Sequence, residues 1–151
     1  MKVCIHRGSH EIGGSCVEIE SQGKRIVLDI GLPLDADMKD TSLPDVSGFT
    51  KHDESLLGIF ISHPHLDHYG LISHPHLDHY GLAEKLNYDV PILIGPAAKR
   101  IIEAAKKFIP SDMNFGNTID LEHKKPIELG PFTLTPYLSP CPTFHFSLFN
   151  H

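Results

Sequence analysis

The feature that most constrains this chain is an eleven-residue segment that occurs twice in succession, at residues 61–71 and 72–82. Both copies read ISHPHLDHYGL without a difference, and together they hold six of the twelve histidines. A strand buries alternate residues on each face, so sliding it by an odd number of residues reverses its faces. One copy can therefore follow a buried strand, and the other has to be accommodated as a loop.

The residues that flank the repeat favour the first copy for the strand end. The run LLGIFI at residues 56–61 predicts a buried strand and leads directly into copy one, whereas the residues before copy two include Gly70 and offer less apolar area. Copy two leads into residues 81–87, which are predicted to be helical, and Pro75 ends any helix that follows copy one. A loop absorbs extra residues at about 0.6 kcal/mol per doubling of its length, less than the loss of a buried strand.

The remaining periodicity predicts one layered α/β domain with strands, an alternating strand–helix region, and strands again. A long acidic loop is expected at residues 32–55, and a hairpin turn at residues 22–24. The other expected elements are strands at 3–6, 15–20, 25–30 and 90–94, a helix at 97–109 and a hairpin at 127–138.

The overall composition is typical of a soluble globular domain, with 151 residues, 40% hydrophobic and 21% charged. Three scattered cysteines do not form a disulfide framework, and neither a signal peptide nor an apolar run of about 20 residues is present, so we expect a cytoplasmic protein without a membrane segment. The net charge of −6 disfavours a nucleic-acid surface. Basic pairs at residues 99–100, 106–107 and 124–125 keep a non-catalytic nucleic-acid-binding module as an alternative.

Each copy carries the pattern His-x-His-x-Asp-His, whose side chains are typical metal ligands. In an extended chain His63 and His65 point the same way and can hold one ion, and a turn would bring Asp67 and His68 to a second ion beside it. Imidazole suits Zn²⁺, and the carboxylate also admits Mn²⁺ or Fe²⁺. Such ions supply activated water near neutral pH. In the alternative register the same set is His74, His76, Asp78 and His79.

This motif after a buried strand resembles the signature of the metallo-β-lactamase superfamily. The stretches GSHEIGGSCVEIE at residues 8–20 and IVLDIGLPLD at residues 26–35 are similar to the opening of its ribonuclease J-like, β-CASP-like branch. The resemblance implies an αββα sandwich with a dinuclear zinc site at one edge, and for this chain we expect one or two zinc ions. It also implies hydrolysis of phosphodiesters, esters, thioesters or amides.

Carried over by position, the resemblance gives each motif residue a role. His63 and His65 would hold the first metal ion, and Asp67 and His68 the second, with Asp67 also steering the attacking water as the catalytic residue. Asp29 matches the Asp-x-Gly that follows an early strand in the family, and its implied role is support of the site.

The end of the chain departs from the family pattern. The resemblance covers residues 1–138, and residues 139–151 are expected to be an aberrant tail that contains His145 and His151. Cys141 stands near the place of the family's third histidine and is a candidate ligand, whereas the bridging aspartate and the last histidine have no candidates. We therefore expect only the N-terminal half of the sandwich, in a truncated chain.

The sequence thus predicts a metal-dependent hydrolase, directed by ancestry to phosphodiesters or RNA, with impaired activity in the chain as written. Two alternatives stay open. One is a non-catalytic remnant that binds metal weakly, and the other is a thioester or lactone hydrolase of the same fold. A small molecule or RNA remains the expected substrate, and the sequence does not fix the oligomeric state.

Overall fold

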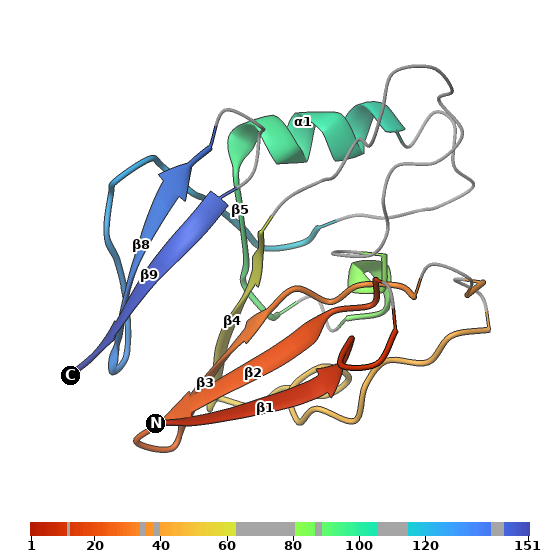
Figure 1. The fold of residues 1–151 in the computed structure, drawn as a ribbon, viewed down its shortest axis with the longest axis horizontal. Coiled ribbons are helices and arrows are strands. Elements are labelled where there is room, and N and C mark those ends of the chain that lie inside the picture. The colour runs from red at the N-terminus through yellow and green to blue at the C-terminus, as the bar shows by residue number, and fades with distance from the viewer. Residues whose placement is uncertain are drawn as a thin grey trace.

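The computed structural model describes residues 1–11, 13–33, 36–37, 40–62, 81–86, 89–105, 115–139 and 144–151. Its larger sheet has six strands in sequential order, antiparallel from β1 to β3 and parallel from β3 to β6 (Figure 1). These strands are β1 (Lys2–Arg7), β2 (Cys16–Ser21), β3 (Lys24–Leu28), β4 (Leu56–Ile61), β5 (Ile92–Ile94) and β6 (Thr118–Asp120).

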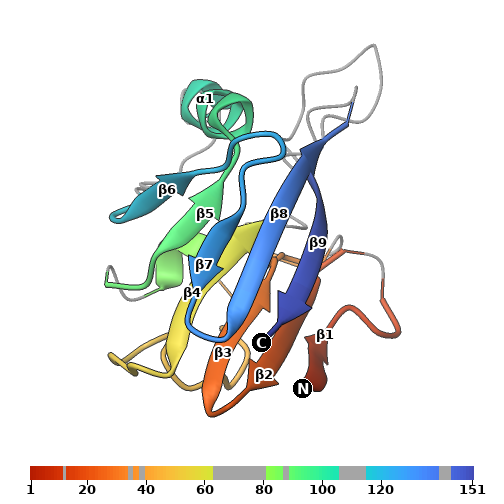
Figure 2. The same cartoon turned by 90° about the vertical axis from the view of Figure 1, so that its left-hand side faces the viewer.

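A smaller antiparallel sheet covers one face of the larger sheet, and helices cover the other. The smaller sheet consists of β7 (Ile127–Leu129), β8 (Phe132–Leu138) and β9 (Phe144–Asn150), in that order (Figure 2). The helix α1 (Pro96–Ala105) and the 3₁₀ turn η1 (Ala83–Lys85) contribute to the core on the opposite face. The result is a layered α+β fold built on a mixed sheet.

Strand β4 lies at the centre of this core and is buried on both faces. Ile59 and Ile61 pack with the helical layer, and Phe60 between them packs with the smaller sheet. A strand covered on both sides needs a continuous apolar sequence, which explains why the run LLGIFI shows no polar alternation. At Gly58 a Cβ would come within 2.6 Å of Leu93 Cδ1, so β4 and its neighbour β5 pack closely at this position.

Most of the predicted elements are present, with three differences. The predicted helix at residues 81–87 is only the 3₁₀ turn η1 in its described part, and strand β6 was not expected. The hairpin turn at Gln22 and Gly23 is confirmed, and both residues have positive φ, of 50° and 72°. Positive φ at both central positions is the conformation whose twist suits a two-residue β-hairpin.

The third difference concerns the end of the chain, where part of the expected aberrant tail at residues 139–151 forms a strand that was not predicted. Residues 144–150 form β9, which pairs with β8 along its whole length from Phe132 opposite Asn150 to Leu138 opposite Phe144. Phe146 and Leu148 pack against the core beneath the smaller sheet. Burial of these alternate apolar residues is the physical reason that this segment is ordered as a strand. Among the described residues, the helices are all too short or too polar to cross a lipid bilayer.

Candidate active site

A buried carboxylate fixes the point at which the chain leaves β4. Asp29 follows β3, and its backbone N–H donates to the carbonyl oxygen of Phe60 at 2.8 Å. Its carboxylate accepts two hydrogen bonds from Ser62, one from the backbone N–H to Oδ1 and one from the hydroxyl to Oδ2, each 2.8 Å long. Asp29 is 8% exposed. The three bonds tie the carboxyl ends of two adjacent parallel strands together.

The backbone at Asp29 is in the left-handed region, with a φ of 58°. Asp and Asn tolerate this conformation better than other non-glycine residues because their short polar side chains form local hydrogen bonds. The turn aims the carboxylate at Ser62, the residue directly before His63 in the sequence. Asp29 is therefore a buried residue that supports the end of β4 through Ser62.

The predicted metal ligands lie outside the described residues. This holds for His63, His65, Asp67 and His68, and equally for His74, His76, Asp78 and His79 of the second copy, and for Cys141. Within the described ranges, His, Cys, Asp and Glu side chains do not gather in groups of three or more that could hold a metal ion. The assignment of the metal site to either copy consequently stays a prediction.

The two histidines near the chain end belong to the smaller sheet. His145 lies in β9 and is exposed, and His151 follows it. The ring Nε2 of His151 lies 2.7 Å from the hydroxyl oxygen of Thr133 on β8. A hydrogen bond within this sheet accounts for His151, and the structure does not bring either histidine together with Asp29 and Ser62.

A second polar network, which the sequence did not reveal, lies at the amino ends of β3 and β4. Arg25 donates to Glu18 Oε2 and to Asp53 Oδ2, both at 3.0 Å. Hydrogen bonds from the Ser47 hydroxyl and from Ser55, and then the charge of Arg25, hold the pKa of the Asp53 carboxyl well below its ordinary value. The network anchors the loop before β4. Its only sequence signal is the placement of Glu18 and Arg25 on neighbouring predicted strands.

Cys16 is buried on the helical face of the sheet and is unsuited to chemistry at neutral pH. Desolvation by burial raises the pKa of its thiol to about 12. Since the thiolate is the form that binds metal or attacks an electrophile, Cys16 serves as a core residue.

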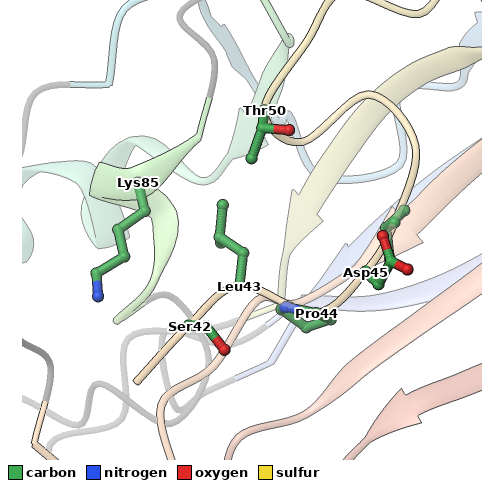
Figure 3. Close-up of a pocket in the computed structure, with 7 residues that line it drawn as sticks. Ser42, Leu43, Pro44, Asp45, Thr50 and Lys85 are labelled. Carbon is green, nitrogen blue, oxygen red and sulfur yellow. The ribbon is translucent and has the colours of Figure 1, made fainter. Parts of the chain in front are cut away.

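A pocket of about 430 Å³ lies between the loop at residues 42–50 and η1 (Figure 3). The amine of Lys85 donates to the carbonyl oxygen of Thr41 at 2.6 Å, so this cation is engaged with backbone. The lining has no histidine or cysteine and one carboxylate, and thus offers no metal-ligand set; it consists of Ser42, Leu43, Pro44, Asp45, Val46, Thr50 and Lys85.

Known proteins share both the fold and part of the sequence, although no family model matches the chain. The Rm3 metallo-β-lactamase superposes with a TM-score of 0.57 and 18% identity, over 90% of this chain and 49% of that protein. The RNase J-like protein of Methanocaldococcus jannaschii is 39% identical over 69 residues, which are 45% of this chain and 14% of that protein. The probable RNase MJ4 of the same organism is 31% identical over 111 residues, 71% of this chain and 22% of that protein.

The mixed sheet with few helices matches solved proteins of the metallo-β-lactamase fold, so the chain has this fold. The chain belongs to the metallo-β-lactamase/β-CASP-like superfamily. Within it, its sequence is similar to ribonuclease J-like members. It spans less than a quarter of the length of the two relatives from M. jannaschii.

Proposed function

We propose that this chain carries the N-terminal ligands of the metal site of a hydrolase that acts on phosphodiesters, with RNA as the favoured substrate class. The observation that carries the proposal is the pair of hydrogen bonds by which buried Asp29 holds Ser62, one residue before the first His-x-His-x-Asp-His motif. The relatives described as RNase J-like and as a probable RNase support the choice of RNA.

The packing of β4 supports copy one as the ligand set. If copy two followed the strand instead, the chain would shift by eleven residues, and Asp67 and Tyr69 would occupy the places of Leu56 and Gly58. Leu56 is 6% exposed, so a carboxylate there would be desolvated without a partner of its own. A tyrosine at the place of Gly58 would collide with the neighbouring strand, because even a Cβ meets Leu93 at 2.6 Å.

In this proposal the donor set fits zinc, with Mn²⁺ or Fe²⁺ as the alternatives that a carboxylate allows. His63 and His65 bind one ion, and Asp67 and His68 bind the second. A zinc ion held there would supply polarisation of the phosphoryl oxygen and a bound water whose pKa is lowered to about 7. Asp67 orients the attacking water through its carboxylate. Asp29 is a positioning residue that acts through Ser62, since it holds the backbone from which the first histidine extends.

Zinc titration calorimetry on two paired variants tests the proposal. His63→Ala with His65→Ala removes the first ligand pair, and His74→Ala with His76→Ala is the matched control in the identical second copy. We expect the first double variant to lose at least about tenfold in zinc affinity and the second to change it little. Equal losses in both variants, or no zinc binding by the parent chain, would contradict the proposal.

Hydrolysis of bis-p-nitrophenyl phosphate with added zinc provides the catalytic readout. We expect slow turnover that exceeds the rate with zinc alone and disappears in Asp67→Asn, because this residue positions the water. Turnover at ordinary enzyme rates, above about 1 s⁻¹, would contradict the expected impairment. Turnover that survives Asp67→Asn unchanged would contradict its assigned role.

A further inference from the structure

The loop between β6 and β7 takes the place of a strand beside the end of β8. Strand β7 begins opposite Leu134, so it does not extend along the last residues of β8. There the N–H of Lys124 donates to the carbonyl oxygen of Pro136 at 2.7 Å. The N–H of Leu138 donates to the ring Nδ1 of His123 at 2.9 Å. His123 therefore provides the acceptor that a carbonyl oxygen of a neighbouring strand would otherwise provide.

The sequence around this loop suits the arrangement. Pro136 has no N–H to donate, and it lies at a buried position of β8 beyond the start of β7. Lys124 has a φ of 61°, a turn conformation, and the turn presents its N–H and the preceding histidine ring to the same strand. The ring of His123 also meets the ring of Tyr137 edge-on, with centroids 6.3 Å apart and an interplanar angle of 84°. These contacts hold the imidazole against the end of β8.

The hydrogen bond from Leu138 is compatible with only one protonation state of His123. A backbone N–H is a donor, so Nδ1 has to carry a lone pair, and the ring is the neutral tautomer with its proton on Nε2. In the imidazolium both ring nitrogens carry protons, and Nδ1 can no longer accept. Histidine is the residue type whose charge ordinarily changes between about pH 5 and 8. The bond at the end of β8 is therefore made by the neutral ring and broken when the ring takes up a proton.

The charges around the ring nearly balance one another. The titratable groups come from the end of β6, from the loop and from both strands of the β8–β9 hairpin: Asp120, Glu122, Lys124, Lys125, Tyr137 and His145. The two carboxylates and the two lysines are exposed, and Glu122 is paired with Lys125 at 2.7 Å. Exposed charges contribute little in water. The hydrogen bond to Leu138 is therefore the interaction that separates the two protonation states of His123.

The end of β8 is coupled by packing to the strand that precedes the histidine motif. Pro136 lies opposite Phe146 in the register of β8 and β9. The rings of Phe146 and Phe60 meet edge-on, with centroids 5.7 Å apart and an interplanar angle of 70°. Phe60 is fully buried, and its carbonyl oxygen accepts the N–H of Asp29. Both views show β8 running in the same direction as β4 (Figures 1 and 2). Release of the β8 end would therefore loosen the packing on the end of β4.

We infer that His123 is a pH-sensitive latch, which holds the carboxyl end of β8 while its ring is neutral and releases it on protonation. Uptake of one proton from solvent at Nδ1 breaks the bond to Leu138, whose N–H then turns to water. The contact between Phe146 and Phe60 transmits the release to β4. The latch needs no metal ion, so its failure and the failure of the proposed hydrolase are separate results.

Amide hydrogen exchange followed by NMR on the full, zinc-free chain tests the latch. Between about pH 8 and pH 5 the protection factor of the Leu138 amide, corrected for intrinsic exchange, should fall by at least about fivefold. In His123→Asn the side-chain oxygen takes the position of Nδ1 and does not titrate, so the protection of Leu138 should change less than about twofold. His145→Asn is the matched control at a neighbouring histidine, and it should keep the fall that the parent chain shows.

Two NMR signals of the parent chain report the bond and its coupling directly. The scalar coupling between the amide nitrogen of Leu138 and Nδ1 of His123 should be present at about pH 8 and absent at about pH 5. The ring signals of Phe146 should shift over the same range and stay constant in His123→Asn. Protection of Leu138 that does not fall in acid, an equal fall in His123→Asn, or a fall abolished by His145→Asn would overturn the inference. Ring signals of Phe146 that do not move with the protonation of His123 would overturn the coupling to β4.

Discussion

Replacement of Asp29 by alanine should destabilise the fold more than any change on the exposed surface. The substitution removes both acceptors of the Ser62 hydrogen bonds, and a hydrogen bond to a charged group contributes about 1.5–3 kcal/mol. Alanine at a φ of 58° adds a backbone cost of about 1 kcal/mol. Together these effects predict a loss of about 4–7 kcal/mol in the free energy of unfolding, against a total of about 5–15 kcal/mol for a small domain.

Three further variants separate the contributions. Asp29→Asn keeps the shape, tolerates the left-handed backbone and retains one oxygen for the Ser62 N–H, so it should cost about 1–2 kcal/mol. Ser62→Ala removes only the hydroxyl donor to the charged carboxylate and should cost about 1.5–3 kcal/mol. Asp120→Asn, at an exposed aspartate at the end of β6, is the control and should stay within about 0.5 kcal/mol.

Urea denaturation followed by circular dichroism measures these differences, provided that the slope of the transition is the same for all variants. An Asp29→Ala loss below about 1 kcal/mol would refute the role of the carboxylate as the anchor of the strand end. An Asn variant as unstable as the Ala variant would show instead that the charge, and not the hydrogen-bond geometry, is decisive.

Three other outcomes follow from the packing and the charges. Gly58→Ala should cost about 1–3 kcal/mol in urea denaturation because its Cβ meets Leu93 at 2.6 Å, and a neutral effect would contradict the close approach of β4 and β5. A thiol reagent at pH 8 should label exposed Cys4 rapidly and Cys16 only on unfolding, as the pKa of about 12 keeps the latter protonated; equal labelling rates would contradict its burial. Asp53→Asn should destabilise the protein at pH 7, and the deficit should shrink below about pH 4, because the lowered pKa makes this carboxylate stabilise the fold only while it is ionised; a deficit that grows in acid would contradict the sign.

The strands around the motif were predictable because their sequences carry strong local signals. The run at residues 56–61 is apolar without alternation, as a strand covered on both faces requires, and it became β4. The hairpin at Gln22 and Gly23 was equally predictable from the sequence, because the polar turn lies between two apolar segments.

The structural features that the sequence did not predict escaped prediction for different physical reasons. Strand β6 has only three residues, so no periodicity could reveal it, and its parallel pairing with β5 depends on tertiary structure. Strand β9 did alternate, with Phe146 and Leu148 on one face, but Pro140 and Pro142 before it favoured the interpretation as a tail. The partner of Asp29 was not predictable either, since Ser62 is 33 positions away and only the parallel pairing of β3 and β4 brings the two together.

The most direct test is a crystal of the zinc-loaded chain measured at the zinc absorption edge. The anomalous map should show its strongest peak within ligand distance of His63 and His65, about 2.0–2.1 Å from a ring nitrogen of each. A strongest peak between His74 and His76, or one that touches neither histidine pair, would contradict the assignment of the hydrolytic centre to the strand end that Asp29 anchors.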